Sequence, residues 1–547
     1  MKQLKLQLFF LYLISGNSLN LYAQQPNTLY FLETSTVRHK LNPSFQPAND
    51  FYLSFPVIGY TEFNIGNNSV TLKDIVYNQN GKTITFLNDS LSIDRFYKTL
   101  KNNTVLRANL QSNLLDFGFH YKSSYLTFSL TERLDGTLSI PKDVFKLSFY
   151  GTRDIYYNSF NFTNLKTDFT AYTEAAFGLA KDVTEKWSIG GKFKILFGHA
   201  NLSNTNRNFT INAGLSKWVL QGEGSVNYSS PVQLNIGDNF QSSSYSNPPR
   251  LIDWLKPSGM GIGVDLGIDY HLNENINLSA AILDLGFIHW NINTINLRYK
   301  VDYTYNGITK LNSNSTLSTY NEVYNQLIFG NLLIDSVSMA FNGSTTKSKS
   351  NDTYSTGTTA KLNLGFEYNL LEHKVGFGFL SHTQFFKNTF TEEITTSVNI
   401  RPNKWLNASL SYSLFNGTLS TFGAGIGFKF GIVNYFATAD YIYFHKISFP
   451  LTDINSRFPD WNIPIPYNSR VFNFSTGLSF VFDHPINVQK YRRSDIIEKN
   501  KGLKTKRKPM IKDSRNGYIK SDNTNFLKSK KGLQQTKPSN DCRCETN

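Results

Sequence analysis

Apolar and polar side chains alternate one by one over long stretches of this chain, and this alternation constrains the fold more than any other feature. It is clearest in residues 259–272, "GMGIGVDLGIDYHL", where every even position is apolar or aromatic and the odd positions are Gly, Asp and His. Successive side chains of a β-strand point to opposite faces, so a period of two separates an apolar face from a polar one. The stretch is therefore predicted to be a strand with hydrocarbon on one side only.

The same alternation recurs along most of the chain. It is found in residues 115–121, 187–197, 361–370, 406–414, 422–430 and 472–482, several of which have glycine on the polar face. A soluble β-sandwich also contains alternating strands, but it rarely has ten or more of them with glycine-rich faces. Aromatic residues make up 15% of the chain, with 44 Phe and 30 Tyr, and charged residues only 17%. This composition is typical of a lipid-facing barrel with aromatic girdles.

These patterns predict an all-β fold, a transmembrane antiparallel outer-membrane β-barrel. No segment after the N-terminus is apolar over the length that a membrane helix needs, so a spanning structure must be built from strands. Bacterial barrels have an even number of strands, and about 30 residues for each strand with its connection gives about 14 or 16 strands, with 14 preferred.

Connections of two lengths join the alternating stretches. Residues 181–186, 273–275 and 401–404 are short and polar, whereas residues 342–358 and 451–469 are long and polar. In outer-membrane barrels the short turns lie on the periplasmic side. Helical spacing in residues 92–103 and 318–341 predicts loop helices that pack over the barrel rim; a gate at a ligand entrance is the alternative.

The N-terminal region divides into two parts before the barrel begins. Residues 1–23 have two lysines and a short apolar run, the layout of a cleaved signal peptide, and predict export. Residues 24–50 include "HKLNPSFQPAND", where Pro43 and Pro47 disfavour both helix and strand. Irregular backbone at membrane depth needs protein or water around it, so this segment is predicted to plug the barrel of residues 51–485. A periplasmic leader is the alternative.

The last 62 residues differ from the rest of the chain. Residues 486–547 hold 17 of the 55 Lys and Arg residues but only 6 of the 40 acidic residues, and they have no apolar periodicity. They are predicted to be a disordered, basic periplasmic tail. The tail is either a solvated extension or a contact to peptidoglycan, anionic lipid or an envelope partner; nucleic acid is not expected in that compartment. Cys542 and Cys544 lie in this tail and are read as a solvated feature.

Motifs for catalysis, metal binding or nucleotide binding do not occur in the sequence, so we expect no enzyme activity, no metal and no cofactor. Charged residues on the polar faces of the strands are the better functional clue. They are predicted to face the lumen, where they either form ion pairs that brace a plugged barrel or line a path for a solute. These residues are Lys192, Lys194, Asp265, Asp269, Lys361, Glu367, Lys429 and Asp440.

Three stretches together resemble an uncharacterised family of outer-membrane barrels found in Bacteroidota. They are "LNPSFQP" at residues 41–47, "GVDLGIDYHLNENINLSAAILDLGFIHW" at residues 263–290 and "IPIPYNSRVFNFSTGLSFVF" at residues 463–482. That family is distantly similar to FadL-type barrels, which include long-chain fatty-acid transporters and PorV-like components of type IX secretion.

The resemblance implies a location, a plug motif and a function. In FadL-type barrels an Asn-Pro-Ala motif belongs to an N-terminal hatch; Asn42 and Pro43 match it, Ser44 replaces the Ala, and Pro47 lies in the same segment. The implied function is passage of a small hydrophobic compound across the outer membrane, with membrane lipid around the barrel. The alternative is a barrel that transports nothing and serves as a scaffold or partner-binding component of the envelope or secretion machinery.

Overall fold

The computed structural model describes residues 25–482 with several gaps. Contacts divide the chain after Pro485, and every described residue belongs to the first of the two units. The expected signal peptide (1–23), the basic tail (486–547) and the expected helix at 318–341 lie outside the described residues. The gaps are at residues 80–81, 88–89, 152–157, 214–216, 237–242, 246–249, 251–252, 254–255, 306–344, 387–388, 416–418, 443–444, 449–461 and 466–469.

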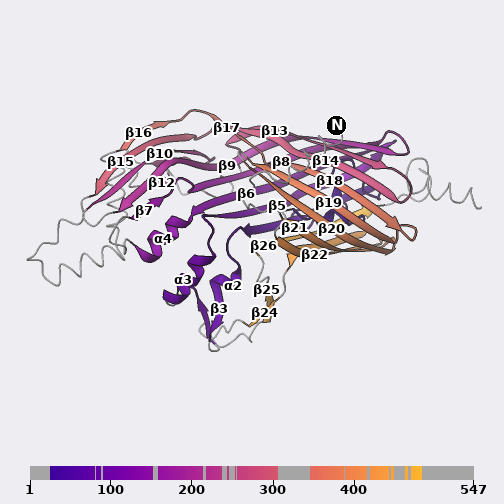
Figure 1. Cartoon of the computed structure of the whole chain (residues 1–547). Helices are drawn as coiled ribbons and strands as arrows, with labels where there is room; N and C mark the ends of the chain where they lie inside the picture. The colour runs from indigo at the N-terminus through magenta and orange to yellow at the C-terminus, as the bar shows by residue number, and fades with distance from the viewer. Residues whose placement is uncertain are drawn as a thin grey trace, which may run out of the picture. The chain divides into compact units, whose positions relative to one another are not determined.

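The described strands form a closed, antiparallel barrel of 14 strands, which confirms the predicted fold class and the preferred strand number (Figure 1). The first barrel strand consists of two pieces, β1 and β2, and the eighth of β17 and β18. In order around the barrel the strands are β1 (Phe51–Ser54) with β2 (Thr61–Asn67), β5 (Asn103–Tyr121), β6 (Ser124–Pro141), β8 (Lys166–Asp182), β9 (Trp187–Ala213), β13 (Gly259–His271), β14 (Ile276–Trp290), β17 (Tyr354–Gly357) with β18 (Ala360–Leu370), β19 (Val375–Phe386), β20 (Thr389–Asn403), β21 (Leu406–Phe415), β22 (Leu419–Phe430), β23 (Val433–Ile442) and β26 (Val471–Phe482).

The last strand closes the barrel against the first. β26 pairs with β23 on one edge, and on its other edge it pairs with β1 and then with β2. Phe51 lies opposite Phe482, and Phe63 lies opposite Phe474. Because every barrel strand has two neighbours, the barrel has no free edge, and its backbone N–H and C=O groups are paired within the wall.

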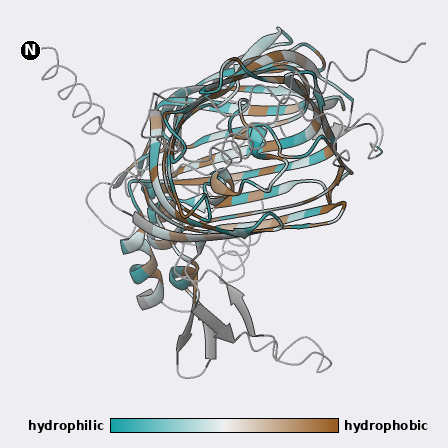
Figure 2. Ribbon diagram, turned by 90° about the vertical axis from the view of Figure 1, so that its right-hand side faces the viewer, coloured by the Kyte–Doolittle hydropathy of each residue, from teal (hydrophilic) through white to brown (hydrophobic). Residues whose placement is uncertain are grey.

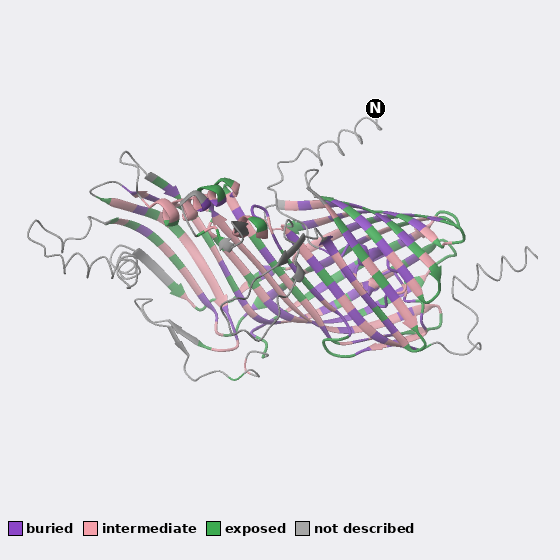
Figure 3. Ribbon diagram, turned by 90° about the horizontal axis from the view of Figure 1, so that it is seen from below, coloured by how far each residue is buried: buried purple, intermediate pink, exposed green. Residues whose placement is uncertain are grey.

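Hydrophobic and hydrophilic residues alternate along the barrel strands, and so do exposed and buried ones, as the sequence predicts (Figures 2 and 3). In β13, Met260 is 56% exposed and Leu266 is 54% exposed, whereas Asp265 is 1% exposed and Asp269 is 7% exposed. The apolar side chains thus form the outer surface of the barrel, and the polar ones are enclosed. This is the reverse of a soluble β-protein, in which the apolar face is the buried one.

All connections at one end of the barrel are short, whereas most of those at the other end are long. The short-turn end has the connections 122–123, 183–186, 272–275, 371–374, 404–405 and 431–432. The opposite end, called here the long-connection end, has the long connections 68–102, 142–165, 214–258, 291–353 and 443–470 and the short connections 387–388 and 416–418.

Two expectations about the connections need correction. Residues 342–358, expected to be a polar loop, contain strands β16 (Thr345–Ser350) and β17. The helix expected at 92–103 is α3 (Ser90–Thr99), which ends earlier because β5 begins at Asn103 and pairs with β6 from that residue on.

Further strands and helices lie at the long-connection end. β9 extends past the barrel and pairs there with β7 (Asn158–Asn161) and β10 (Trp218–Ser229); β10 pairs with β15 (Ile295–Tyr305), and β15 pairs with β16. None of the helices in the described part of the chain is long and apolar enough to cross a membrane. The remaining elements are α2 (Leu72–Ile75), α4 (Lys142–Tyr150) and the short hairpins β3 (Val76–Gln79) with β4 (Lys82–Thr85), β11 (Leu234–Ile236) with β12 (Ser243–Tyr245) and β24 (His445–Ser448) with β25 (Asn462–Ile465).

Candidate functional site

Residues 25–50, called here the plug, lie inside the barrel and precede β1. The plug contains two short 3-10 helices, η1 (Thr28–Phe31) and η2 (Arg38–Lys40), and only Glu33 and Ala48 in it are exposed. Its apolar side chains form a core with apolar residues that face inward from the barrel. The members of this core are Leu29, Tyr30, Phe31, Leu32, Val37, Leu41, Phe45, Tyr60, Leu380 and Phe436.

A row of small residues in the wall makes room for Asn42 and Pro43. The row crosses four neighbouring strands at one level and consists of Ala180, Gly190, Gly267 and Ala281. A Cβ atom on Gly267 would collide with Asn42 and Pro43, and one on Gly190 would collide with the backbone of Pro43 and Ser44. Two glycines face each other in this row because backbone and side-chain atoms of the plug occupy the space that their side chains would fill.

Asn42 is anchored to the wall and to its own segment. Its amide nitrogen donates to the backbone oxygens of Ile268, at 3.2 Å, and Ala280, at 3.4 Å. Its side-chain oxygen accepts hydrogen bonds from the backbone N–H of Ser44 at 3.0 Å and from the Ser44 hydroxyl at 2.7 Å. Ser44, where the FadL-type motif has Ala, thus supplies a bond that Ala could not. Pro43 and Pro47 are buried too.

A network of buried charges lies in the middle of the lumen. Lys194 Nζ is 2.8 Å from Asp265 Oδ2, 2.6 Å from Asp284 Oδ1 and 3.5 Å from Glu174 Oε2. Two more cations complete the network. Arg133 lies 3.2 Å from Glu174 and 3.1 Å from Asp284, and Lys361 Nζ lies 3.1 Å from Asp284. Three carboxylates therefore face three cations, which offsets part of the cost of burying them.

A second polar chain joins the plug to the wall. Lys192 Nζ lies 2.7 Å from His39 Nδ1, His39 Nε2 lies 2.7 Å from the Tyr52 hydroxyl, and Tyr52 donates to Asp116 Oδ1 at 2.7 Å. Lys40 Nζ lies 3.9 Å from Asp116 Oδ2. Burial lowers the pKa of His39 well below its usual value, and the positive charges of Lys192 and Lys40 lower it further. A neutral imidazole can accept a hydrogen bond from Lys192 at Nδ1 and donate one at Nε2.

Other predicted lumen charges lie in separate contacts. Asp440 is 1% exposed and accepts a hydrogen bond from the backbone N–H of Thr28 in the plug at 3.2 Å. Glu367 is paired with Arg401, whose Nη2 also lies 3.3 Å from Glu33 Oε1 of the plug.

The last two predicted lumen charges lie toward the short-turn end. Asp269 Oδ2 is 2.9 Å from His271 Nε2. Lys429 lies near the end of β22 and is only partly buried, outside the central network. Within the described ranges, no group of three His, Cys, Asp or Glu side chains is placed to hold a metal ion.

Sequence reasoning missed Asp284, where the strand alternation breaks. Ile282 is 41% exposed and Leu285 is 48% exposed, whereas the two residues between them are buried. The pairing of β13 with β14 shifts at this point, and Asp284 has a positive φ of 58°. A β-bulge therefore turns Asp284 into the lumen. The signal was visible, because the outward apolar residues of β14 change from even to odd numbers here. Arg133 and Glu174 were missed as well, although each lies on the polar face of an alternating strand.

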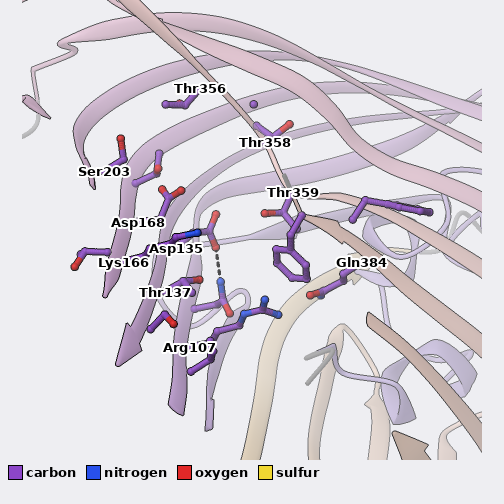
Figure 4. Close-up of a pocket in the computed structure, with 18 of the residues that line it drawn as sticks. Arg107, Asp135, Thr137, Lys166, Asp168, Ser203, Thr356, Thr358, Thr359 and Gln384 are labelled. Carbon is purple, nitrogen blue, oxygen red and sulfur yellow. Dashed lines mark hydrogen bonds between the residues drawn. The ribbon is translucent and has the colours of Figure 1, made fainter. Parts of the chain in front are cut away.

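A cavity of about 1310 Å³ adjoins the charge network on the side of the long-connection end (Figure 4). Arg133, Asp284 and Lys361 belong both to the network and to the cavity lining, so the network forms part of the cavity floor. One wall is formed by β5, β6, β8 and β9, and β17, β18 and β19 contribute the facing side. Arg107 in this lining is 8% exposed, and its guanidinium carbon lies 3.6 Å from the centre of the Phe386 ring.

Comparison with models of protein families assigns the chain to a family. The model of a family of unknown function, DUF5723, matches residues 43–440. The chain belongs to this family. The DUF5723 match includes β1 to β22 and nearly all of β23, and it begins at Pro43 of the plug. No curated protein matches the chain in sequence.

Solved structures with a similar arrangement include hydrocarbon transporters. The Ralstonia pickettii toluene transporter TbuX is 9% identical, with a TM-score of 0.36 over 81% of this DUF5723 chain and 93% of TbuX. The Pseudomonas putida toluene transporter TodX is 7% identical, with a TM-score of 0.35 over 82% of this chain and 93% of TodX. A Pseudomonas aeruginosa FadL homologue is 9% identical, with a TM-score of 0.36 over 85% of this chain and 99% of the homologue. The TM-scores of these superpositions are low, so the assignment of the fold depends on the strand pairings of this chain itself.

Proposed function

We propose that this DUF5723 protein is an outer-membrane barrel that admits a small solute through a lumen closed by its own N-terminal plug. The observation that carries the proposal is the combination of an apolar outer surface with a lumen that holds both the N-terminal plug and a cavity. The plug is one continuous segment at the N-terminal end of the described chain, so it can shift without breaking any strand pairing of the wall.

The floor of the cavity supports this proposal. The charge network separates the cavity from the short-turn end, and the plug packs beneath it, with Lys40 Nζ 2.9 Å from Thr131 Oγ1 on β6. A solute that reaches the cavity would therefore have to displace plug contacts before it could leave at the short-turn end. The small hydrophobic compound expected from the FadL resemblance remains a prediction, and the polar side chains of the cavity weigh against it.

The test is a flux measurement on purified protein in lipid vesicles. Removal of residues 25–48 is expected to raise the permeability to small solutes at least tenfold, while the barrel keeps its heat-modifiable migration in gels. Removal of residues 486–547 serves as the control and is expected to leave the permeability unchanged. Equal permeability of the intact and plug-deleted barrels would contradict the proposal. Membrane fractionation of the native host tests the outer-membrane location directly.

A second candidate function is a scaffold or partner-binding component of the envelope. The sheet formed by β7, β9, β10, β15 and β16 favours it, because passage through the lumen needs no such extension of β9 beyond the barrel. The basic residues 486–547 are the other candidate contact. Cross-linking in cells followed by purification would test this function; recovery of the same proteins with and without the tail would exclude the tail as the binding element.

A further inference from the structure

The cavity is lined mostly by residues with polar side chains. Of its 34 lining residues, nine are Ser or Thr, eight are Asn or Gln and nine are charged, whereas six are Ala, Val, Leu, Ile or Phe. Small-molecule sites are usually lined mainly by hydrophobic and aromatic side chains with a few polar groups, and this lining has the opposite balance of residue types. An apolar solute here would strip water from many hydrogen-bonding groups without replacing those bonds, which costs free energy for each group.

The polar groups are arranged in rows across one wall. Arg107, Thr137, Asp168 and Ser203 lie directly opposite one another on β5, β6, β8 and β9. Neighbouring strands are about 4.8 Å apart, so a row of this kind presents hydrogen-bonding groups at regular steps over about 14 Å. Figure 4 shows these four side chains together along this wall of the cavity.

A second row lies one step deeper. Its members that line the cavity are Asn109, Asp135 and Thr170, which are paired in the same way on β5, β6 and β8; Asn201 of β9 is paired with Thr170 but lies outside the lining. Asn109 donates to one carboxylate oxygen of Asp135 at 2.6 Å, and an ionised carboxylate can accept several hydrogen bonds. Both rows mix donors with acceptors, as a ligand with many hydroxyl groups requires.

Charges of both signs occur in the lining, so the cavity does not select an ion by its overall field. Five lining residues are Lys or Arg, and four are Asp or Glu. The two basic residues of the floor, Arg133 and Lys361, are ion-paired with Asp284. Neutral ligands that both donate and accept hydrogen bonds suit such a balanced surface. The volume of about 1310 Å³ exceeds the roughly 300–1,000 Å³ of ordinary small-molecule sites, so more than one sugar ring and ordered water fit.

We propose that the cavity binds a small saccharide, a neutral ligand rich in hydroxyl groups, along the first polar row on β5, β6, β8 and β9 and the second on β5, β6 and β8. The inference deepens the proposed function, because it concerns the solute of the same cavity. Hydroxyl groups of the saccharide would bond to Thr137, Asp168 and Ser203 of the first row and to Asp135 and Thr170 of the second.

The first experiment measures binding rather than passage. The labelled full-length protein in detergent micelles is applied to an array of mono- to tetrasaccharides, and the best-bound saccharide is then titrated by calorimetry. Toluene and palmitate are titrated in parallel. Saccharide binding that is retained in 0.5 M salt is expected. An array without any bound saccharide, or binding of toluene or palmitate alone, would overturn the proposal.

Variants then place the saccharide in the cavity. Thr137→Val and Ser203→Ala each remove a hydroxyl group with little change in volume and are expected to weaken binding by about threefold to tenfold. Thr396→Val is the matched control, because Thr396 is exposed on β20 away from the cavity, and it should leave the affinity unchanged. If Thr137→Val and Ser203→Ala bound the saccharide as tightly as Thr396→Val does, the assignment to these rows would be overturned.

Flux distinguishes failure of this inference from failure of the proposed function. If the saccharide binds but does not pass through the plug-deleted barrel, the binding site stands and the transport function falls. If small solutes pass through the plug-deleted barrel while no saccharide binds, the transport function stands and the saccharide inference falls.

Discussion

His39 makes the stability of the packed plug depend on pH. Its imidazole faces the side chains of Lys192, Lys40, Tyr52 and Asp116, and burial beside the two ammonium groups keeps its pKa well below the usual value. In the unfolded chain the pKa of His39 is about 6.5. Below that pH the unfolded state takes up a proton that the folded state does not. Plug stability should therefore fall as the pH drops from about 6.5 toward the lower folded pKa.

Hydrogen exchange of residues 25–50 between pH 7.5 and 5.5 measures this effect. After correction for the intrinsic exchange rate, the fraction of wild-type plug that is open should increase as the pH falls. His39→Gln should reduce the pH dependence of the corrected opening in this range, because glutamine carries no titrating group. A wild-type plug that became more protected at pH 5.5 would contradict the assignment of His39 as a buried neutral base.

Lys194 is the residue on which the central network depends. Its replacement by Met would leave Glu174, Asp265 and Asp284 with less compensating charge, and loss of one partner of a buried ion pair costs about 3–5 kcal/mol. Equilibrium unfolding by urea in lipid vesicles should show a loss of that size for Lys194→Met. Lys186→Met, in an exposed turn, should change the unfolding free energy by less than about 0.5 kcal/mol.

The elements that hold the plug are the four neighbouring strands that carry the row Ala180, Gly190, Gly267 and Ala281. The Gly267→Val variant should fold into a barrel, because the wall itself accepts valine in a strand, but its side chain would occupy the place of Asn42 and Pro43. Protease cleavage within residues 25–50 and solute permeability should both rise. Gly191→Val is the control, since a Cβ there would meet its nearest neighbour at an ordinary 3.7 Å. A protected plug in Gly267→Val would show that the row does not seat it.

At the scale of the whole molecule, closure of the barrel depends on β26. A chain that ends at Pro485 retains every strand of the wall and should migrate in unheated gels as a compact barrel. A chain that ends at Arg470 lacks β26 and leaves the edges of β1, β2 and β23 unpaired, so it should not form a protease-resistant barrel. Assembly of the shorter chain would contradict this account of closure.

Alternation along the sequence was sufficient to predict the architecture, because a strand between lipid and an enclosed lumen needs one apolar and one polar face. β13 illustrates this: Met260, Ile262 and Leu266 were predicted to face away from Asp265, and they do. Only part of the central charge network could be predicted from the sequence. Lys194, Asp265 and Lys361 lie on regular strands, whereas Asp284 depends on a bulge that reverses the faces of β14. A period-two reading that assumes continuous strands assigns such a residue to the wrong face.

The composition of the cavity could not be read from the sequence in advance. Its rows join Arg107, Thr137, Asp168 and Ser203, which are far apart along the chain and meet only through the register of four paired strands. The sheet formed by β10, β15 and β16 was missed for a related reason, since pairing across long connections leaves no local signal. Turn lengths, by contrast, are local, and the short-turn end was predictable.

Local periodicity by itself determined that this chain forms a membrane-type barrel, because the choice of which face meets hydrocarbon is made at every second residue. Only the tertiary structure decided what the barrel encloses. The fit of Asn42 and Pro43 against Gly190 and Gly267, the pairing of Lys194 with Asp284, and the polar rows of the cavity all depend on register between distant strands. Register is set by closure of the whole wall, and no short segment of the sequence contains that information.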